Sequence, residues 1–319
     1  MSAQVEAQLP NLGYGNAQTA ALKFQTIMDA NTADHLVVGE FEIGSAAHRR
    51  GLARFFLDTH IDYEPDGIQW PALGETERTR LIGLPFWQEA VNTESETSRR
   101  VMAAAQLESD AQLRKAIELQ GFEESRHARL LAALTARYRI PIQTPPPFQP
   151  SSAETDFLQA GFGECFDSFF AFGLIAIASE SGYFTPELVR IFEPVVQEEA
   201  RHILFFVNWV KYRRSQLPWW KRPLFRARCG WLILRQVASR VKTAKTLGGS
   251  EDNSAQSSAD NFTLSAHKDL GTDLTLHALL GRCLAENERR MAPYDGRLLR
   301  PRLVPTLARL LYRLLPASI

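Results

Sequence analysis

Two stretches of this chain with helical character carry the same short motif, a glutamate followed three residues later by a histidine. Glu124 and His127 form the first copy, and Glu199 and His202 form the second. Residues three apart lie on the same face of an α-helix, so each copy presents a carboxylate and an imidazole in one direction. A single copy is common on solvated helix faces. Two copies constrain the fold more, because they predict two helices that face each other around one shared site.

Proline and glycine divide the chain around these motifs into helical segments. Both residues are sparse from 86 to 138, where apolar side chains recur at helical spacing and a break near Ser109 and Asp110 separates two long helices. Residues 140–152 contain clustered prolines, which lack amide donors and favour extended geometry. This stretch is therefore expected to be a crossover connection that follows a first helical hairpin.

A second hairpin is expected from about 155 to 212, with its turn at residues 181–186. Thr185 can cap the fourth helix and Pro186 can occupy its first position, where no amide hydrogen is needed. Two hairpins with one long connection between them are typical of the ferritin-like variant of the four-helix bundle. The predicted fold class is all-α, a ferritin-like four-helix bundle with additional N- and C-terminal helices.

The predicted organisation has three parts. Residues 1–84 form an N-terminal helical extension with one or two helices, including one over 45–59. Residues 85–213 form the bundle. Residues 214–319 form a basic, helical C-terminal extension with a mobile loop over 246–264, where small and polar residues dominate.

The bundle needs one further carboxylate from each of its first and third helices, level with the motifs. Glu94 and Glu124 have their midpoint in the predicted break between the first two helices, so an antiparallel hairpin brings them to the same height. Glu164 and Glu199 have their midpoint in the second turn. Helix formation requires neither coincidence, so Glu94 and Glu164 are the predicted partners of the two motifs.

The neighbours of Glu94 on its helix favour it over the nearby Glu96. The residues that share a stripe with Glu94 are Trp87, Ala90, Val91, Ser98, Val101 and Ala105. The residues that share a face with Glu96 are Glu89, Asn92 and Arg100, which indicates a solvated face. Glu94 is therefore expected on the buried side of its helix, as are the other predicted ligands on theirs.

Four carboxylates on the buried faces of one bundle need compensating charge. Unpaired carboxylates are almost never fully buried, because lost hydration costs several kcal/mol per ion. Two divalent cations would neutralise them, and the two imidazoles complete a nitrogen and oxygen ligand set that suits iron or manganese. The alternative is a polar core closed by salt bridges from Arg126, Arg129 or Arg201. That alternative leaves the histidine spacing and the matched heights unexplained.

At these residues the chain resembles the ferritin-like diiron-carboxylate superfamily, whose oxidative members carry Glu, ExxH, Glu and ExxH on successive bundle helices. The resemblance covers residues 86–212, and the spacings within each hairpin are similar to those of bacterial multicomponent monooxygenases, ribonucleotide reductase small subunits and acyl-carrier-protein desaturases. It implies one iron held mainly by Glu94, Glu124 and His127 and a second held by Glu164, Glu199 and His202, with Glu124 and Glu199 as bridges. A manganese–iron pair is an alternative to two iron ions.

Two positions depart from the patterns of particular branches. Ribonucleotide reductase small subunits place a radical tyrosine one helical turn after the first motif histidine, where this chain has Leu131. Arylamine N-oxygenases carry an additional histidine one turn before the second motif, where this chain has Val195. The first departure disfavours a reductase. The second argues against a close relationship with the N-oxygenases and leaves a more distant one open.

The resemblance implies a reduced diiron centre that activates O2 for attack on a bound substrate. Simple ferritins are much shorter, whereas this chain has about 85 residues before the bundle and about 105 after it, so an enzyme is favoured over an iron store. The expected substrate is organic, apolar or acyl-type, and electrons are expected from a separate ferredoxin or reductase, because the chain has no flavin or dinucleotide motif. The alternatives are a ferroxidase or peroxide scavenger, and a binding module with a vestigial site.

An apolar substrate pocket is expected beside the metal ions, lined by aromatic side chains near the predicted ligands. The candidates are Trp87, Phe162, Phe166, Phe169, Phe170, Phe172 and Phe206. Ordinary core packing is an equal alternative for each of them.

The charge balance argues against a nucleic-acid partner, but two segments are locally basic. Lys plus Arg and Asp plus Glu both number 36. Residues 217–245 hold eight basic residues and no acid, interleaved with aromatic residues. Residues 297–313 hold five arginines and no acid, and a basic amphipathic helix is expected after Pro305. Such segments bind an acidic carrier protein, an anionic membrane or a phosphorylated substrate, or pack onto the bundle with solvated arginines.

Cysteine usage and the absence of targeting signals indicate a cytoplasmic protein. Cys165, Cys229 and Cys283 lie far apart, which indicates neither a disulfide framework nor a thiolate zinc site. The N-terminus lacks the features of a secretory signal, and the longest apolar run, 166–178, is shorter than the roughly 20 residues that span a bilayer. Peripheral membrane contact and a homodimer are left open.

Overall fold

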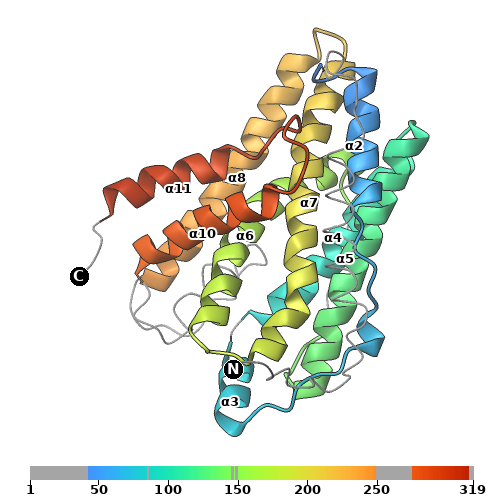
Figure 1. Ribbon diagram of the computed structural model, residues 1–319. Helices are drawn as coiled ribbons and strands as arrows, with labels where there is room; N and C mark the ends of the chain where they lie inside the picture. The colour runs from blue at the N-terminus through green and yellow to red at the C-terminus, as the bar shows by residue number, and fades with distance from the viewer. Residues whose placement is uncertain (1–41, 85, 145–146, 148–149, 249–274, 316–319) are drawn as a thin grey trace, which may run out of the picture.

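The computed structural model of the chain describes residues 42–84, 86–144, 147, 150–248 and 275–315. Within these ranges the chain forms nine α-helices and no strand, which confirms the all-α prediction (Figure 1). The helices are α2 (Ala46–Asp58), α3 (Glu75–Gly83), α4 (Trp87–Leu107), α5 (Ala111–Tyr138), α6 (Ala153–Glu180), α7 (Pro186–Gln216), α8 (Arg222–Gly248), α10 (Leu276–Met291) and α11 (Leu303–Leu314). A short 3-10 helix, η1 (Pro65–Gly67), lies between α2 and α3.

Four long helices, α4 to α7, form the bundle. α4 packs against α5 and α6 packs against α7, which gives the two predicted hairpins. α4 also contacts α6, and α5 contacts α7, so the hairpins face each other (Figure 1). The proline-rich connection between α5 and α6 crosses from one hairpin to the other. This arrangement is compatible with the ferritin-like fold.

The helix ends follow the local signals in the sequence. The first hairpin turns between α4 and α5, where Asp110 accepts hydrogen bonds from the backbone N–H groups of Gln112 and Leu113. The second hairpin turns before Pro186, which occupies the first turn of α7, and the Thr185 hydroxyl accepts from the backbone N–H of Leu188. Both turns are therefore confirmed, and they align the hairpins at the heights that the site requires.

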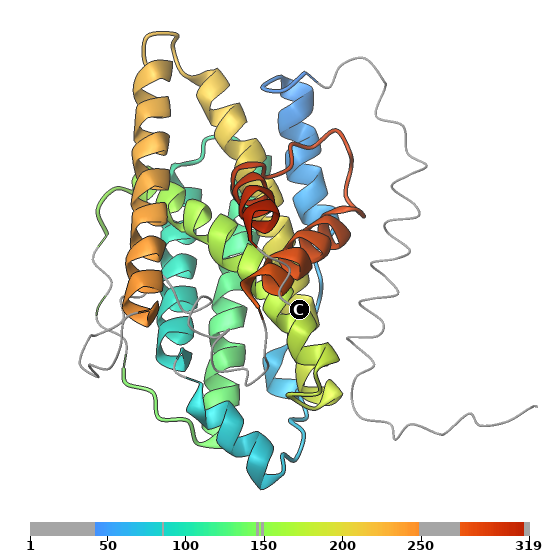
Figure 2. The ribbon, with the colours of Figure 1, turned by 90° about the vertical axis from the view of Figure 1, so that its left-hand side faces the viewer.

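The remaining described helices pack onto the bundle. α2, which confirms the helix expected over 45–59, contacts α5 and α7. α10 contacts α6 and α7, α11 contacts α10 and α6, and α8 contacts α6 and α7. In Figure 2, α8 forms one edge of the molecule, and α10 and α11 lie over α6. α6 is therefore covered on more than one side.

Two glycines allow these close approaches to α6. A Cβ atom at Gly161 would lie 2.2 Å from Cδ2 of Phe206 on α7, and one at Gly173 would lie 2.4 Å from the sulfur of Cys283 on α10. Among the described residues α6 is the one helix long and apolar enough to cross a membrane, and 50% of its most apolar window is buried inside the fold. Its apolar character is used for packing on both the bundle side and the α10 side.

Two expectations for the C-terminal extension are corrected. α8 continues to Gly248, so the first residues of the loop expected over 246–264 are helical, and the rest of that loop lies outside the described residues. α11 begins at Leu303 rather than after Pro305. Proline is tolerated in a first helical turn because the amide hydrogens there have no intrahelical acceptor.

Candidate metal centre

A buried cluster of carboxylates and imidazoles occupies the interior of the bundle. Its members are Glu94 of α4, Glu124 and His127 of α5, Glu164 of α6, and Glu199 and His202 of α7. One set of ligand atoms within 4.8 Å of one another comes from Glu94, Glu124, His127 and Glu199, and a second comes from Glu124, Glu164 and His202. The structure therefore brings all six predicted ligands together, and one glutamate belongs to both sets.

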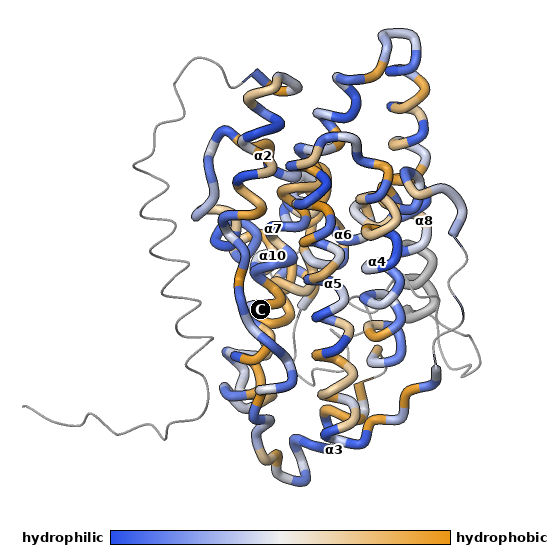
Figure 3. Tube along the Cα trace, turned by 90° about the vertical axis from the view of Figure 1, so that its right-hand side faces the viewer, coloured by the Kyte–Doolittle hydropathy of each residue, from blue (hydrophilic) through white to orange (hydrophobic). Residues whose placement is uncertain are grey.

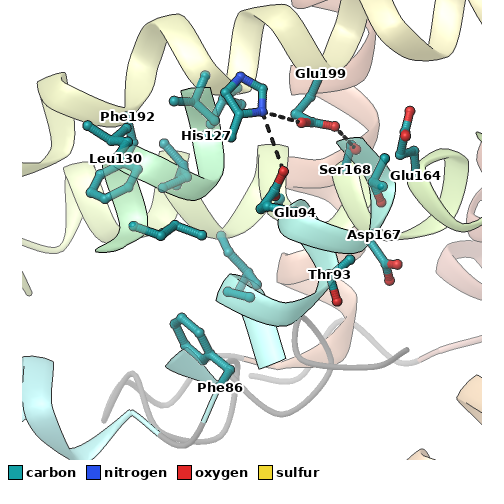
Figure 4. Close-up of a pocket in the computed structure, with 18 of the residues that line it drawn as sticks. Phe86, Thr93, Glu94, His127, Leu130, Glu164, Asp167, Ser168, Phe192 and Glu199 are labelled. Carbon is teal, nitrogen blue, oxygen red and sulfur yellow. Dashed lines mark hydrogen bonds and ion pairs between the residues drawn. The ribbon is translucent and has the colours of Figure 1, made fainter. Parts of the chain in front are cut away.

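Both imidazoles direct Nδ1 into this cluster. Nδ1 of His127 lies 3.3 Å from Oε1 of Glu199 and 3.5 Å from Oε2 of Glu94 (Figure 4). Nδ1 of His202 lies 2.8 Å from Oε1 of Glu124 and 3.9 Å from Oε1 of Glu199. Each motif thus places a carboxylate beside the imidazole of the other motif, which is the geometry that bridging carboxylates need.

Several buried polar atoms of the cluster lie close to one another but make no hydrogen bond of acceptable geometry. The buried atoms without a hydrogen-bond partner include Oε1 of Glu124, Oε1 of Glu164, Nδ1 of His127 and Nδ1 of His202. Buried polar atoms are normally paired, so atoms of this kind that converge in one cluster could hold a metal ion. Imidazole nitrogen and carboxylate oxygen both coordinate divalent metals, so the donor set fits a metal centre.

The second nitrogen of each histidine is held by a glutamate from the opposite motif helix. Nε2 of His127 lies 2.8 Å from Oε2 of Glu198, and Nε2 of His202 lies 2.8 Å from Oε2 of Glu123. Glu123 and Glu198, here called the outer glutamates, each precede a motif glutamate directly. Glu123 of α5 reaches the histidine of α7, and Glu198 of α7 reaches the histidine of α5. Both contacts orient the imidazole rings and leave Nδ1 facing the cluster.

A fully buried arginine neutralises each outer glutamate. Arg126 forms an ion pair with Glu198, and Nη1 of Arg201 lies 2.9 Å from Oε1 of Glu123. Removing one partner of such a pair would leave a charge buried without compensation, which costs far more than the loss of an exposed pair. The outer glutamates and their arginines therefore form a closed charge network behind the histidines.

The segment that runs from α2 to η1 completes this network. Arg126 donates to the carbonyls of Ile61 and Tyr63, each at 3.0 Å, and Arg201 donates to the carbonyl of Phe56 at 2.6 Å. The α2 helix and the chain after it therefore hold both guanidinium groups from the side opposite the cluster.

A third group of potential ligands, His60, Glu123 and Glu198, has a different character. Its ligand atoms also lie within 4.8 Å of one another, and Nδ1 of His60 lies 2.6 Å from Oε1 of Glu123. Both carboxylates, however, are already paired with Arg201 and Arg126. Their charge is compensated, so this group belongs to the support of the histidines and needs no cation.

The pKa shifts distinguish Glu124 and Glu164 of the cluster from the outer glutamate Glu123. Burial, and then the charge of neighbouring glutamates, raises the pKa of Glu124 and of Glu164 well above the ordinary value. Burial acts in the same direction on Glu123, but the charge of Arg201 and hydrogen bonds from two histidines outweigh it and hold the pKa of Glu123 well below the ordinary value. Glu123 is stable as an anion, whereas the charged forms of Glu124 and Glu164 need added positive charge. Within the cluster, hydrogen bonds from His127 and Ser168 and the charges of both histidines outweigh burial and lower the pKa of Glu199.

A largely apolar cavity of about 240 Å³ opens onto the cluster. The ligands that form part of its wall are Glu94, Glu124, His127, Glu164 and Glu199. The apolar residues around it include Leu81, Leu84, Phe86, Trp87, Leu130, Phe184, Leu188 and Phe192, several of which Figure 4 shows. The polar residues are Thr93, Thr97, Arg100, Gln159, Asp167, Ser168 and Gln236, from α4, α6 and α8.

The aromatic lining expected from the sequence is mostly wrong. Of the seven candidates only Trp87 borders the cavity. The others pack in the hydrophobic core and are Phe162, Phe166, Phe169, Phe170, Phe172 and Phe206. Phe166, Phe169 and Phe170 of α6 pack with residues of α10 and α11, because α6 is covered by these helices as well as by its bundle partners. Phe86, Phe184 and Phe192 line the cavity instead.

Other residues that the sequence singled out are placed as follows. Glu96 forms an ion pair of 2.8 Å with Arg100 along α4 and takes no part in the cluster. Leu131 and Val195, the positions that depart from two branches of the superfamily, both line the cavity. These two positions thus present apolar surface to whatever the cavity holds.

The outer glutamates were missed in the sequence, although a signal for them exists. The chain reads Glu-Glu-Ser-Arg-His in α5 and Glu-Glu-Ala-Arg-His in α7, so the repeated unit is five residues long rather than four. Two charged residues in addition to the ligands recur at the same places in both copies. Recurrence of this kind in two facing helices indicates that the extra pair also serves the site.

Comparison of the chain with protein-family models, with curated proteins and with solved structures finds no match. The case for a metal centre therefore rests on the convergence of the donor atoms in one buried cluster and on the lack of well-formed hydrogen bonds to several of them.

Proposed function

We propose that this protein is a non-haem diiron oxidase or oxygenase that uses O2 to oxidise an organic substrate of apolar or acyl type. The observation that carries the proposal is the direct opening of an apolar cavity onto the cluster of metal-binding side chains. Small-molecule sites are typically apolar pockets with a few polar groups at the reacting end. A site of this construction places a hydrocarbon next to the metals.

Iron ions bound here would supply O2 activation and electron transfer, chemistry that amino-acid side chains do not provide. Glu94 and His127 would hold one ion, Glu164 and His202 the other, and Glu124 and Glu199 would bridge them. Ser168 donates a hydrogen bond of 2.8 Å to Oε2 of Glu199 and so orients that carboxylate. The described part of the chain offers no second redox group, and electrons are expected from a separate ferredoxin or reductase.

The walls of the cavity supply binding and exclude water from the reacting end. Leu130 and Phe192 lie near His127 (Figure 4), and together with Leu131, which also lines the cavity, they would hold a hydrocarbon chain by apolar contact. Removal of apolar surface from water contributes about 25 cal/mol per Å². The polar residues on the α4, α6 and α8 side would receive the polar end of an amphiphilic substrate.

The competing function is that of a ferroxidase or peroxide scavenger, in which iron or peroxide is itself the substrate. An iron ion needs a hydrophilic path to the site, whereas most of this cavity wall is apolar. The apolar wall therefore favours an organic substrate.

The test is to load the protein with Fe(II) without O2, to measure bound iron by mass spectrometry, and then to follow O2 consumption with and without fatty acyl, alkane and arylamine compounds. We expect about two iron ions per chain, lost in Glu124→Ala, and O2 consumption that rises with an apolar compound. O2 consumption that depends only on added Fe(II) would support the ferroxidase. Failure to bind iron would refute both functions and leave a helical binding protein.

A further inference from the structure

The outer face of α8 carries a stripe of large apolar side chains exposed to solvent. Leu224, Trp231 and Leu234 are 73%, 57% and 68% exposed, and Trp219 and Trp220, in the turn just before the helix, are 75% and 60% exposed. The spacings of seven and three residues put Leu224, Trp231 and Leu234 on one side of the helix. Within the described ranges, this segment and α11 hold ten of the 15 large hydrophobic residues that are exposed.

Basic residues flank this stripe. Lys221, Arg222, Arg226 and Arg235 are exposed, and residues 217–248 contain no acid. The opposite face of the helix uses its arginines differently, because Arg240 forms an ion pair of 2.6 Å with a carboxylate of α6. The inner face is thus joined to the bundle by an ion pair. The outer face presents positive charge next to apolar surface, and no acidic residue in the described part of the chain forms an ion pair with Lys221, Arg222, Arg226 or Arg235.

Figure 3 shows apolar and polar residues alternating along α8, which stands at the edge of the molecule in Figure 2. A large exposed apolar patch bordered by charge indicates a binding surface rather than ordinary solvent-exposed structure. The basic border requires an anionic partner.

We propose that the outer face of α8 binds the surface of an anionic lipid bilayer. Helices that lie in the membrane interface combine Trp and Leu on one face with Lys and Arg beside it, as here. Tryptophan favours the headgroup region because its ring is apolar and its N–H remains hydrated. An acidic protein would satisfy the arginines but would not by itself require a stripe of tryptophan and leucine.

This orientation would also place the cavity near the bilayer. Gln236, on the inner face of the same helix, lines the cavity together with Gln159 and Asp167 of α6. An apolar compound dissolved in the membrane would then have a short path to the site. The lipid-binding proposal itself does not depend on the metal centre, because it concerns binding and not oxidation.

The experiment is co-sedimentation of the full chain with vesicles of phosphatidylcholine alone and of phosphatidylcholine with phosphatidylglycerol. We expect binding to the anionic vesicles at least about tenfold tighter than to the neutral ones, and weaker binding at high salt, because surface charge is screened. The variant Trp231→Glu, Leu234→Glu should bind anionic vesicles at least about tenfold more weakly, because it removes apolar burial and adds repulsion.

The matched control is Leu107→Glu at the end of α4. Leu107 is 69% exposed, against 68% for Leu234, so the two substitutions change equally accessible leucines. The control should bind vesicles within about twofold of the parent protein. Circular dichroism must show equal helix content for all variants.

Three results would overturn the proposal. The first is no binding of the parent protein to anionic vesicles. The second is equal binding by the α8 variant and the control, which would place any membrane contact elsewhere, for example on α11. The third is a parent protein that dimerises through α8, detected as a monomeric α8 variant in analytical ultracentrifugation with no difference in vesicle binding.

Discussion

The two sides of the candidate metal centre differ in how firmly they are held. On the side of α5 and α7, both histidines are held by outer glutamates, and the outer glutamates by buried arginines. On the side of α4, Glu94 is partly exposed, its side chain 19% accessible. The cavity is bordered by Glu94 and Glu164 and also by Glu124, His127 and Glu199, on the side of those residues that faces away from the outer glutamates. One side is rigid and charged, and the other is open and apolar.

This difference indicates that the two sides have separate roles, one in holding the histidines in place and the other in giving access to the cluster. Rigid support for the imidazoles keeps the site in one geometry before a metal arrives, as preorganised sites require. The cavity on the open side would leave space next to the same residues for the O2 and the substrate of the proposed reaction. A structural metal site needs only the first property, whereas the combination favours a reacting centre.

The largest expected effect follows from breaking the rigid side. Glu198→Ala leaves Arg126 and His127 without their acceptor, and we expect the free energy of unfolding of the metal-free protein to fall by about 3–5 kcal/mol. Chemical denaturation measures this. Glu96→Ala, which removes a partly buried ion pair along α4, should change it by less than about 1 kcal/mol. Equal losses in the two variants would contradict a special role for the outer glutamate.

A milder change at the same position separates support of the ligand from support of the fold. Glu198→Gln keeps the shape but weakens the hold on His127, and we expect metal affinity to fall about 10–100-fold with helix content retained. Titration with Mn(II) against a chelator under anaerobic conditions measures the affinity. Thr93→Val, on the open side, is the matched comparison and should leave metal affinity nearly unchanged.

A substitution on the open side should affect substrate turnover and leave metal affinity nearly unchanged, the reverse of the effect expected for Glu198→Gln. Ala171→Phe narrows the cavity, and we expect metal affinity to stay within about twofold while kcat/KM for an apolar substrate falls about tenfold or more. Ala136→Phe, at an exposed position of α5, is the control and should affect neither quantity. A loss of metal in Ala171→Phe would show that the two sides are not independent.

The smallest effect concerns pH. Burial and neighbouring charge raise the pKa of Glu124 and of Glu164 in the folded protein. The metal-free folded state therefore binds more protons than the unfolded state, and this contribution to stability is lost as pH rises from the unfolded pKa through the folded one. Bound metal replaces those protons, so the rise in Tm caused by Mn(II) should be larger at pH 8 than at pH 6, by about 2–4 °C. Scanning calorimetry measures the difference. An equal rise at both pH values would contradict the raised pKa values.

The bundle could be predicted from the sequence because the features that determine it act within one helical turn or recur in both hairpins. The turn residues Asp110 and Thr185 act within one helical turn, and the heights of Glu94 and Glu164 follow from the turns. Glu94 could be told from Glu96 because the two faces of α4 differ sharply in polarity. Such differences are visible without knowledge of tertiary contacts.

The aromatic lining of the cavity and the partners of the outer glutamates could not be predicted, because both depend on which helices pack against each other. α6 is apolar on nearly all sides, so its periodicity does not distinguish the side facing the bundle from the side facing α10, and the cavity aromatics were misplaced. The partners of Glu123 and Glu198 lie on the opposite helix, about 75 positions away along the chain. Only the repetition of a longer motif pointed to them.

The contacts of the outer glutamates join the first hairpin to the second, which has a consequence for folding during synthesis. α5 belongs to the first hairpin and α7 to the second, and each supplies the carboxylate that the other's histidine and arginine need. A nascent chain that has left the ribosome only as far as α6 holds Arg126 and Glu123 without their partners. The centre is therefore assembled late in synthesis, and a product truncated before Arg201 would expose unpaired charges and be recognised as unfinished by cellular proteases.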